Sequence, residues 1–321
     1  MKLKPTDKKL LAYLYHNNRE TLTKIAKGSG LSREQVDYKI NKLIQIGIIK
    51  KFIPIINYSK LGYTKLIVIL LKFNKQENIN IFMKEHLKDS FWISRGEILA
   101  KYDLFMTLIF RNDKEKNDYL TNLLQKHNKY ILDYLILQPY FAELYPIKFL
   151  GNKKREDYIL AEYQKKNEIL DEKDKAILKV LEKNARTKFI DIAKKTGLSS
   201  ELILYKLKKL NEKGVLLGSR IQFDTEKLGY FYATLLINIK EFSSENQAKI
   251  RDFARDSPHI ITTAFMLGKP NCFISLLYKS ENDLRNLIEN MRNLFKNQYI
   301  EIEILPVKSE KEEINTLPFL S

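Results

Sequence analysis

Residues 21–47 read TLTKIAKGSGLSREQVDYKINKLIQIG, and this stretch decides the fold. Two runs with helical spacing of apolar residues flank the Gly-Ser-Gly segment at 28–30, whose residues tolerate the left-handed dihedrals of a tight turn. Ser32 precedes the second run and Gln35 follows three residues later, as a capping box requires. The stretch therefore predicts a short helix over about 21–27, a turn, and a longer helix that ends at Gly47.

The flanking residues complete a small domain. Upstream, leucines at 10, 11 and 14 recur at helical spacing and predict a first helix. Downstream, residues 48–58 are β-rich and carry two adjacent lysines, which we interpret as a wing hairpin. Three helices and a β wing predict a winged helix-turn-helix. Its longest helix should bury one apolar stripe, formed by Val36, Ile40, Leu43 and Ile44.

The chain repeats this pattern after a shift of 167 residues. Without gaps, residues 7–48 and 174–215 share 18 identities in 42 pairs. Leu61-Gly62-Tyr63 likewise falls on Leu228-Gly229-Tyr230. Two copies of one unit are therefore expected, over 1–150 and 168–321, and the polar stretch between them reads as a surface linker that is partly helical.

The second part of each copy predicts a ferredoxin-like β-α-β-β-α-β unit, so the fold class is α+β. The expected elements in copy one are 63–73, 79–87, 91–99, 102–110, 114–130 and 131–141, and in copy two 230–240, 244–255, 259–267, 271–279, 281–296 and 299–307. The predicted domains are winged helix-turn-helix 1 (1–62), ferredoxin-like domain 1 (63–150), a linker (151–167), winged helix-turn-helix 2 (168–229) and ferredoxin-like domain 2 (230–321).

The charge favours a polyanionic partner. The 321 residues carry a net charge of +17. Residues 1–62 hold 13 basic and 4 acidic residues, and residues 168–229 hold 14 and 10, whereas the two ferredoxin-like parts have nets of +3 and −1. The surplus lies where a winged helix meets phosphates, so we expect double-stranded DNA as the partner. A lysine-rich genome composition is the alternative explanation.

The remaining composition excludes several classes. Cys272 is the one cysteine, so neither an intrachain disulfide nor a cysteine-based metal site can form. The longest apolar run, at 66–71, is far shorter than the roughly 20 residues that cross a bilayer, and the start lacks a secretory pattern. We therefore expect a cytoplasmic protein without a membrane partner.

Together these residues resemble the Lrp/AsnC (leucine-responsive, or feast/famine) transcription regulators. The resemblance covers both halves and rests on Asp7 to Leu11, Ile25-Ala26, Gly30-Leu31-Ser32, Lys39-Ile40, Gly47 and Leu61-Gly62, with their counterparts Asp174, Ile192-Ala193, Gly197-Leu198-Ser199, Lys206-Leu207 and Gly214. The family usually carries one copy per chain and pairs two chains through the sheets. A tandem chain resembles a covalent pseudo-dimer, and further homo-oligomerisation through the exposed sheet edges is expected.

The third helix of each copy should enter the major groove, with its first turn at the base edges. Arg33 can pair with guanine and Gln35 with adenine, although capping competes for Gln35. The family usually has arginine at positions 39 and 206, where this chain has lysine. The predicted DNA-binding residues are Lys24, Ser32, Arg33, Glu34, Gln35, Tyr38, Lys39, Lys42, Lys50 and Lys51 in copy one, and Ser199, Ser200, Tyr205, Lys206, Lys208 and Lys209 in copy two.

The two heads are expected to differ. Leu202 and Leu204 replace Gln35 and Asp37 in copy two, where they would contact thymine methyls, bury against another protomer, or mark a loss of base reading. We therefore hypothesise that the N-terminal head dominates affinity.

The resemblance also implies an amino-acid effector near a Gly-x-x-Asp turn. The matching segments are Ala100-Lys-Tyr-Asp103 and Gly268-Lys-Pro-Asn271, each of which departs from the motif at one end. The candidate effector residues are Lys101, Tyr102, Asp103, Lys269 and Asn271.

No catalytic constellation is apparent, so we predict that the chain is not an enzyme and needs no cofactor. The four histidines, at 16, 86, 127 and 259, lack metal-ligand spacing, so no metal site is expected. Two alternatives stay open. Siroheme decarboxylases resemble tandem Lrp/AsnC chains, and for that chemistry His259 and Arg95 are the available residues; the other alternative is an architectural DNA-binding or scaffold protein.

Overall fold

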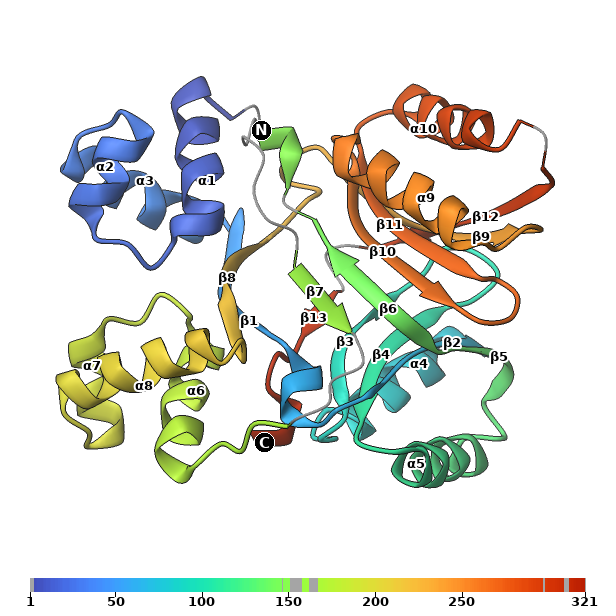
Figure 1. Ribbon diagram of the computed structural model, residues 1–321, viewed down its shortest axis with the longest axis horizontal. Helices are drawn as coiled ribbons and strands as arrows, with labels where there is room; N and C mark the ends of the chain where they lie inside the picture. The colour runs from blue at the N-terminus through green and yellow to red at the C-terminus, as the bar shows by residue number, and fades with distance from the viewer. Residues whose placement is uncertain are drawn as a thin grey trace.

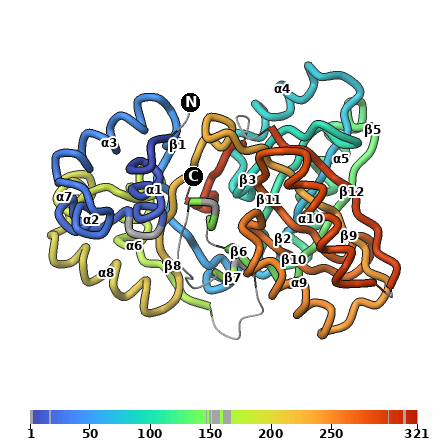
Figure 2. The backbone as a smooth tube through the Cα atoms, turned by 90° about the horizontal axis from the view of Figure 1, so that it is seen from above, coloured from blue at the N-terminus to red at the C-terminus, as the bar shows by residue number. Residues whose placement is uncertain are grey.

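The computed structural model describes residues 3–145, 147–150, 158–161, 167–296, 298–308 and 312–320. It contains two helical heads on one side and two helix-covered sheets on the other (Figure 1). Both heads lie on the same side when the molecule is turned (Figure 2). Among these residues, no helix combines the length and the apolar character needed to cross a membrane.

Each head consists of three helices, as predicted. The first head contains α1 (Pro5–Asn17), α2 (Leu22–Ser29) and α3 (Arg33–Gln45), and the second contains α6 (Glu172–Lys183), α7 (Phe189–Thr196) and α8 (Ser200–Glu212). Local chemistry fixes their ends. Gly30 adopts φ 70° after α2, and the predicted capping box joins Ser32 to Gln35 at the start of α3.

The buried stripe of α3 is confirmed for Val36, Ile40 and Leu43, each less than 5% exposed. The prediction was wrong for Ile44, which is 44% exposed. Ile44 borders a groove that α3 shares with residues 184–188 of the second head, so its side chain faces the space between the heads rather than its own core.

The predicted wing hairpin is absent from the described residues. Residues Ile49–Ile56 form one strand, β1, and its partner is the antiparallel strand β8 (Leu216–Phe223) of the other copy. Phe52 lies opposite Ile221, and both contribute to the core of the first head. A hairpin within one copy is unnecessary because the duplicated strand satisfies the backbone hydrogen bonds of the first.

The ferredoxin-like units contain their six elements in the predicted order. Copy one contains β2 (Lys65–Phe73), α4 (Gln76–Glu85), β3 (Trp92–Glu97), β4 (Leu104–Phe110), α5 (Asp113–Lys126) and β5 (Ile131–Leu137). Copy two contains β9 (Phe231–Ile239), α9 (Ser244–Asp256), β10 (Ile260–Met266), β11 (Cys272–Tyr278), α10 (Glu281–Leu294) and β12 (Ile300–Val307). Three further strands are β6 (Pro139–Leu144), β7 (Tyr158–Ala161) and β13 (Glu313–Ile314). The sheet orders are β13-β3-β4-β2-β5 and β12-β9-β11-β10-β6-β7.

Each copy also adds a strand to the sheet of the other copy. The predicted single strand 131–141 is therefore wrong: it ends at Leu137, and β6 (Pro139–Leu144) crosses to pair with β10. The C-terminal strand β13 (Glu313–Ile314) crosses in the opposite direction to pair with β3. Of the predicted linker, residues 158–161 form strand β7 on β6 rather than a helix, while 151–157 and 162–166 lie outside the described residues.

The two sheets pack face to face, with helices on the outer faces (Figure 1). Alternate residues of β2 explain this arrangement, because Ile69 and Leu71 face α4 and α5 whereas Val68 and Leu70 face the second sheet. Val68 and Leu70 share their core with Leu236 of β9.

Reciprocal polar contacts join the heads. Arg19 donates to the carbonyl of Ala185, and Arg186, its equivalent after the 167-residue shift, donates to the carbonyl of Asn18. The fully buried Asn18 also exchanges two hydrogen bonds with Ser219 of β8, at 3.0 and 2.6 Å. One chain therefore holds its two heads in a fixed, pseudo-symmetric pair.

Candidate nucleic-acid interface and central cavity

The third helices of the two heads present matching exposed faces. Ile203, Leu207 and Leu210 of α8 bury the same stripe as their counterparts on α3. On the opposite side, Tyr38 of α3 is 65% exposed and Tyr205 of α8 is 57% exposed. Large aromatic side chains are normally buried, so matching exposure in both copies indicates a contact surface.

A lysine accompanies each exposed tyrosine. Lys42 Nζ lies 5.8 Å from the centroid of the Tyr38 ring, and Lys209 Nζ lies 5.6 Å from that of Tyr205. Among the ion pairs of the described residues, neither lysine has a carboxylate partner. Each pair therefore offers a cation beside an apolar ring, which suits a phosphate and the sugar next to it.

Lys39 and Lys206 are positioned differently, because carboxylates of their own heads already hold them. Lys39 Nζ lies 2.5 Å from Asp7 Oδ1, and Lys206 pairs with Asp171 and, at 3.3 Å, with Asp174. These pairs tie the third helix to the first turn of the first helix. An ammonium group has three N–H donors, so a phosphate that contacts either lysine would share it with the carboxylate.

The first turn of α3 exposes Arg33 and Glu34, whereas Gln35 is engaged in capping, its Oε1 accepting from Ser32 N at 3.0 Å. Hydrogen bonds from the backbone of Glu34 and from the Ser32 hydroxyl lower the pKa of the Glu34 carboxyl. In the second head Ser199 caps α8 by accepting from Leu202 N. The other predicted contact residues in this region have solvent-exposed or half-buried side chains: Lys24, Ser200 and Lys208.

Lys50 and Lys51 do not lie at a hairpin tip, because β1 pairs with β8 along its length. Burial lowers the pKa of Lys51, and the nearby Glu182 of α6 opposes this shift. Both lysines are half-buried and lie on the strand that joins the heads. Their position corrects the wing interpretation and makes them part of the junction between the heads.

The predicted effector residues brace strand ends. Asp103 accepts a hydrogen bond from Phe73 N and pairs with Lys72, each at 2.8 Å. Asn271, its counterpart in copy two, exchanges hydrogen bonds with both backbone groups of Ile239. The others have no shared pocket: Tyr102 is buried with Lys101 over its ring, and Lys269 is exposed.

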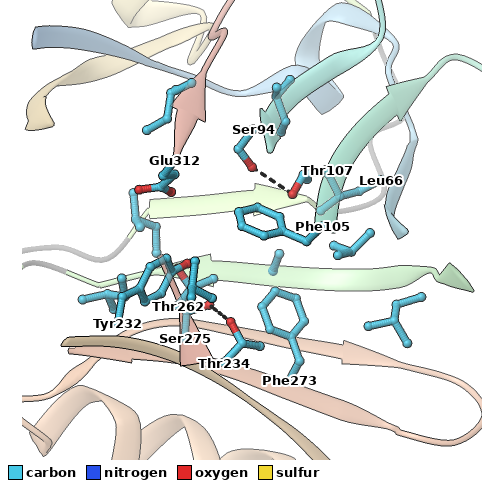
Figure 3. Close-up of a pocket in the computed structure, with 18 of the residues that line it drawn as sticks. Leu66, Ser94, Phe105, Thr107, Tyr232, Thr234, Thr262, Phe273, Ser275 and Glu312 are labelled. Atoms are coloured by element: carbon cyan, nitrogen blue, oxygen red, sulfur yellow. Dashed lines mark hydrogen bonds between the residues drawn. The ribbon is translucent and has the colours of Figure 1, made fainter. Parts of the chain in front are cut away.

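A cavity of about 200 Å³ lies between the two sheets and beside β1 and β8. Its walls are mainly apolar, with Phe105 and Phe273 at equivalent positions of the two copies (Figure 3). Hydroxyl pairs from each sheet line it as well: Ser94 with Thr107 at 2.9 Å, and Thr234 with Ser275 at 3.3 Å.

One end of this cavity is charged. Arg220 of β8 and Glu312, just before β13, both line it, together with Tyr232. Burial raises the pKa of the Glu312 carboxyl, and the charges of Arg220 and Lys50 oppose that shift. A half-buried cation and carboxyl beside apolar walls are suited to orienting a small polar-headed ligand. Sequence reasoning missed this site because its residues come from both copies and meet only in the folded chain.

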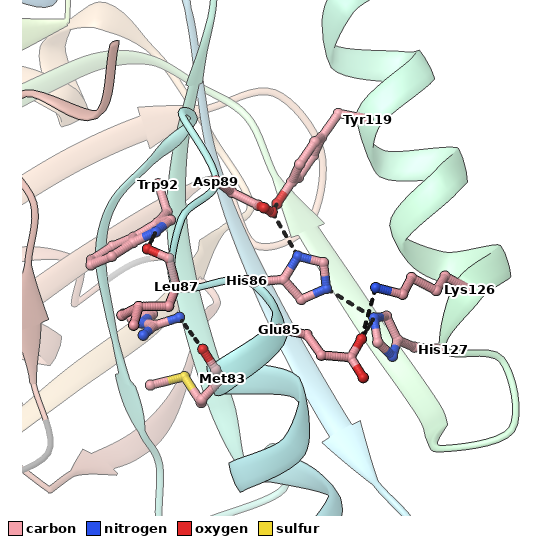
Figure 4. Close-up of polar contacts among 10 residues, drawn as sticks. Met83, Glu85, His86, Leu87, Asp89, Trp92, Tyr119, Lys126 and His127 are labelled. Carbon is pink, nitrogen blue, oxygen red and sulfur yellow. Dashed lines mark hydrogen bonds and ion pairs between the residues drawn. The ribbon is translucent and has the colours of Figure 1, made fainter. Parts of the chain in front are cut away.

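The sequence suggested that the four histidines are scattered, but two of them meet in the structure. His86 and His127 lie 41 residues apart, yet their Nε2 atoms are 2.8 Å from each other (Figure 4). Burial lowers the pKa of His127, and His86 contributes to the same shift. His259 instead contacts the carbonyl of Leu277 on the second sheet.

Comparison with known proteins decides the family. A winged helix-turn-helix DNA-binding model matches residues 3–50 and 170–216. LrpA of Pyrococcus abyssi, an HTH-type transcriptional regulator, is 43% identical over 125 residues, which cover 38% of this chain and 85% of that protein. The chain belongs to the Lrp/AsnC family. The regulatory protein AsnC of Escherichia coli is 29% identical over 128 residues, covering 39% of this chain and 81% of AsnC.

The LrpA of Pyrococcus horikoshii is 45% identical over 67 residues, a match that spans about half of that relative (48%). The matches to LrpA of Pyrococcus abyssi and to AsnC are 125 and 128 residues long, shorter than one copy of the repeat, and the winged helix-turn-helix model matches once in each copy. This Lrp/AsnC chain therefore carries the winged helix-turn-helix twice.

A solved structure matches the chain from end to end. The siroheme decarboxylase NirDL covers 99% of this chain and 96% of its own, with a TM-score of 0.63 and 18% identity. A second structure of NirDL, in complex with an iron-uroporphyrin III analogue, covers the same shares with a TM-score of 0.62. At 18% identity, the structural similarity shows that this chain and NirDL share a fold. Our prediction that the chain is not an enzyme is contradicted, because the protein that shares the whole tandem architecture is one.

Proposed function

We propose that this chain is a sequence-specific DNA-binding transcriptional regulator that acts as a pseudo-dimer, with both heads supplied by one polypeptide. The observation that carries the proposal is the duplicated contact face: each third helix presents an exposed tyrosine and a lysine that has no carboxylate partner within the described part of the chain. The concentration of basic residues in the two heads supports it.

The two heads are held in a fixed pair, which predicts a fixed spacing between the DNA half-sites. Strands β1 and β8 and the reciprocal arginines hold the heads together without a second chain. A two-headed reader of this kind should select two half-sites at one fixed spacing. Selection of bound duplexes from a random pool tests this, and recovery of no enriched sequence would favour the architectural alternative.

Matched variants test the inequality of the heads. Tyr38→Ala with Lys42→Gln alters the first head, and Tyr205→Ala with Lys209→Gln alters the second by the same chemistry. Because Leu202 replaces Gln35 in the second head, we expect the first pair to cost more affinity for the selected duplex in an electrophoretic shift at fixed salt. Equal losses would contradict an N-terminal bias.

We place the effector of this regulator in the central cavity rather than at the two turns, because Asp103 and Asn271 are already engaged by backbone groups. The chemistry of the cavity suits a small, mainly apolar molecule with one carboxylate, which Arg220 would orient. Calorimetric titration with the apolar amino acids, on the wild type and on Arg220→Gln, tests this. Binding that Arg220→Gln leaves unchanged would count against the cavity.

Assembly beyond one chain is proposed through the edge strand β5. Leu132, Tyr134 and Ile136 are 67%, 48% and 37% exposed. Tyr134 and Ile136 pair with Leu71 and Ile69, so they lie on the sheet face that α4 and α5 cover elsewhere. An uncovered apolar edge of this kind favours pairing with a second copy. Analytical ultracentrifugation of the wild type and of Tyr134→Lys should show loss of a larger species in the variant.

Decarboxylation of a carboxylated tetrapyrrole is the second candidate function, and the end-to-end match with NirDL favours it. The cavity does not fit such a group as it stands. Its volume of about 200 Å³ is below the roughly 300–1,000 Å³ of common ligand pockets. Arg220 is the one cation among the described lining residues, which include no histidine, whereas a uroporphyrin carries carboxylates around its whole rim.

The residues first considered for that chemistry are also engaged elsewhere. Arg95 is buried against Trp92 and donates to Glu313 and to the carbonyl of Met83. His259 lies just before β10 of the second sheet and contacts the carbonyl of Leu277. We therefore assign no catalytic role to any residue. Titration with iron-uroporphyrin III, followed by its Soret absorption, separates the two candidates: tight binding would support the enzyme, and no spectral change would remove it.

A further inference from the structure

Two helices of the first sheet domain end at the same point. His86 is the C-cap residue of α4, and His127 is the C-cap residue of α5. The carboxyl end of a helix carries partial negative charge, so two such ends favour a cation between them. Both imidazoles are buried, with 7% and 2% of their surfaces exposed.

The hydrogen bonds of this cluster fix the histidine orientations (Figure 4). His86 Nδ1 lies 2.6 Å from Asp89 Oδ2, which also accepts from the Tyr119 hydroxyl at 2.6 Å. With its proton on Nδ1, a neutral His86 directs the lone pair of Nε2 at His127 Nε2, 2.8 Å away. Two bare nitrogens cannot face each other at that distance, so a proton or a metal ion must lie between them.

A carboxylate completes the set. Glu85 Oε2 lies 3.7 Å from His127 Nε2, and the ligand atoms of Glu85, His86 and His127 all lie within 4.8 Å of one another. Glu85 is 40% exposed, which leaves one side of the cluster open to solvent. Lys126 Nζ contacts the same carboxylate at 2.7 Å and would move aside when a cation binds.

The second copy shows that the fold does not require these imidazoles. Lys75 and Ser243, the N-cap residues of α4 and α9, are 168 residues apart, as are Asn112 and Ser280, the N-cap residues of α5 and α10. By this shift Ala254 corresponds to His86 and Phe295 to His127, and both are buried in the apolar core beneath α9 and α10. Imidazoles in place of apolar side chains bring a polar cost to the first copy, and a bound ion would offset it.

We propose that His86 Nε2, His127 Nε2 and Glu85 bind one divalent transition-metal ion of the zinc class, with solvent in the fourth position. Zinc takes imidazole nitrogen and carboxylate oxygen at about 2.0–2.2 Å, so small side-chain rotations bring these three groups to tetrahedral separations. Asp89 serves as the outer carboxylate that orients a metal-binding histidine. The ion would link the C-terminal ends of α4 and α5.

Uptake of Co²⁺ and Zn²⁺ by the full-length chain, purified without a polyhistidine tag, tests the proposal. We expect one equivalent of Co²⁺ to give the visible d–d absorption of a tetrahedral nitrogen–oxygen site, one equivalent of Zn²⁺ to displace it, and Zn²⁺ to raise the melting temperature. The double variant His86→Ala with His127→Phe copies the second copy and should fold, yet lose all three responses.

Two single changes keep the proposal falsifiable if the double variant fails to fold. Asp89→Asn should weaken Zn²⁺ affinity by about 10–100-fold, as loss of an outer-shell carboxylate does. Lys126→Gln should tighten it, because a competing cation leaves Glu85. His259→Gln, remote from the cluster, should leave it unchanged. A wild-type chain that binds no Co²⁺, or affinity that none of the cluster variants alters, would overturn the proposal.

Discussion

Replacing Lys42 and Lys209 together by glutamine should weaken DNA binding in a way that depends on salt. Both lysines are exposed, stand beside the exposed tyrosines and have no carboxylate partner among the described residues. Each phosphate contact contributes about 0.9 to the slope of log affinity against log salt, through counterion release. Loss of two contacts should therefore make the slope shallower by about 1.8.

The change in slope can be converted into a change in the affinity ratio of wild type to variant. A fourfold rise in salt, for instance from 50 to 200 mM, should shrink the affinity ratio of wild type to variant by roughly 12-fold, since four raised to the power 1.8 is about 12. Fluorescence anisotropy with a labelled duplex at several salt concentrations measures it. Lys84→Gln with Lys88→Gln is the matched control, because it removes the same charge from exposed positions around the end of α4. Parallel slopes for wild type and the Lys42/Lys209 variant would refute the assignment of α3 and α8 as the DNA-contacting helices.

Three further outcomes follow from the buried and ionised groups. Asn18→Ala should lower the free energy of unfolding by about 1–3 kcal/mol for each group of Ser219 left unpaired. Chemical denaturation can measure this loss against Asn80→Ala, which changes an exposed asparagine of α4. The hydrogen bond from Lys206 lowers the pKa of Asp171 to about 2. The ionised Asp171 therefore stabilises the fold fully above about pH 4, and this stabilisation is lost as the pH falls through 2. An acid titration of stability should show the loss in the wild type and not in Asp171→Asn. Burial raises the pKa of the Cys272 thiol, so a thiol reagent at neutral pH should label the unfolded chain and spare the folded one; rapid labelling of the native protein would contradict that burial.

Local patterns in the sequence predicted the heads closely. Short-range signals determine a helix-turn-helix, since the Ser32–Gln35 capping box and the glycine at φ 70° act within one turn of the chain. The six elements of each ferredoxin-like unit were likewise readable from periodicity, because alternation and helical spacing are properties of consecutive residues. The duplicated sequence also predicted that one chain would contain two equivalent units.

Pairing between the copies was decided only by the tertiary structure. The β-rich segment 48–58 is equally compatible with a hairpin and with pairing to a strand of the other copy. No local pattern therefore distinguished a wing from the β1–β8 pair. The exchange of β6 and β13 between sheets, the cavity with Arg220 and Glu312, and the approach of His86 to His127 depend on contacts between residues tens to hundreds of positions apart. Sequence determined which elements form because that information is local; the fold determined which side chains meet, because that depends on how the two copies close on each other.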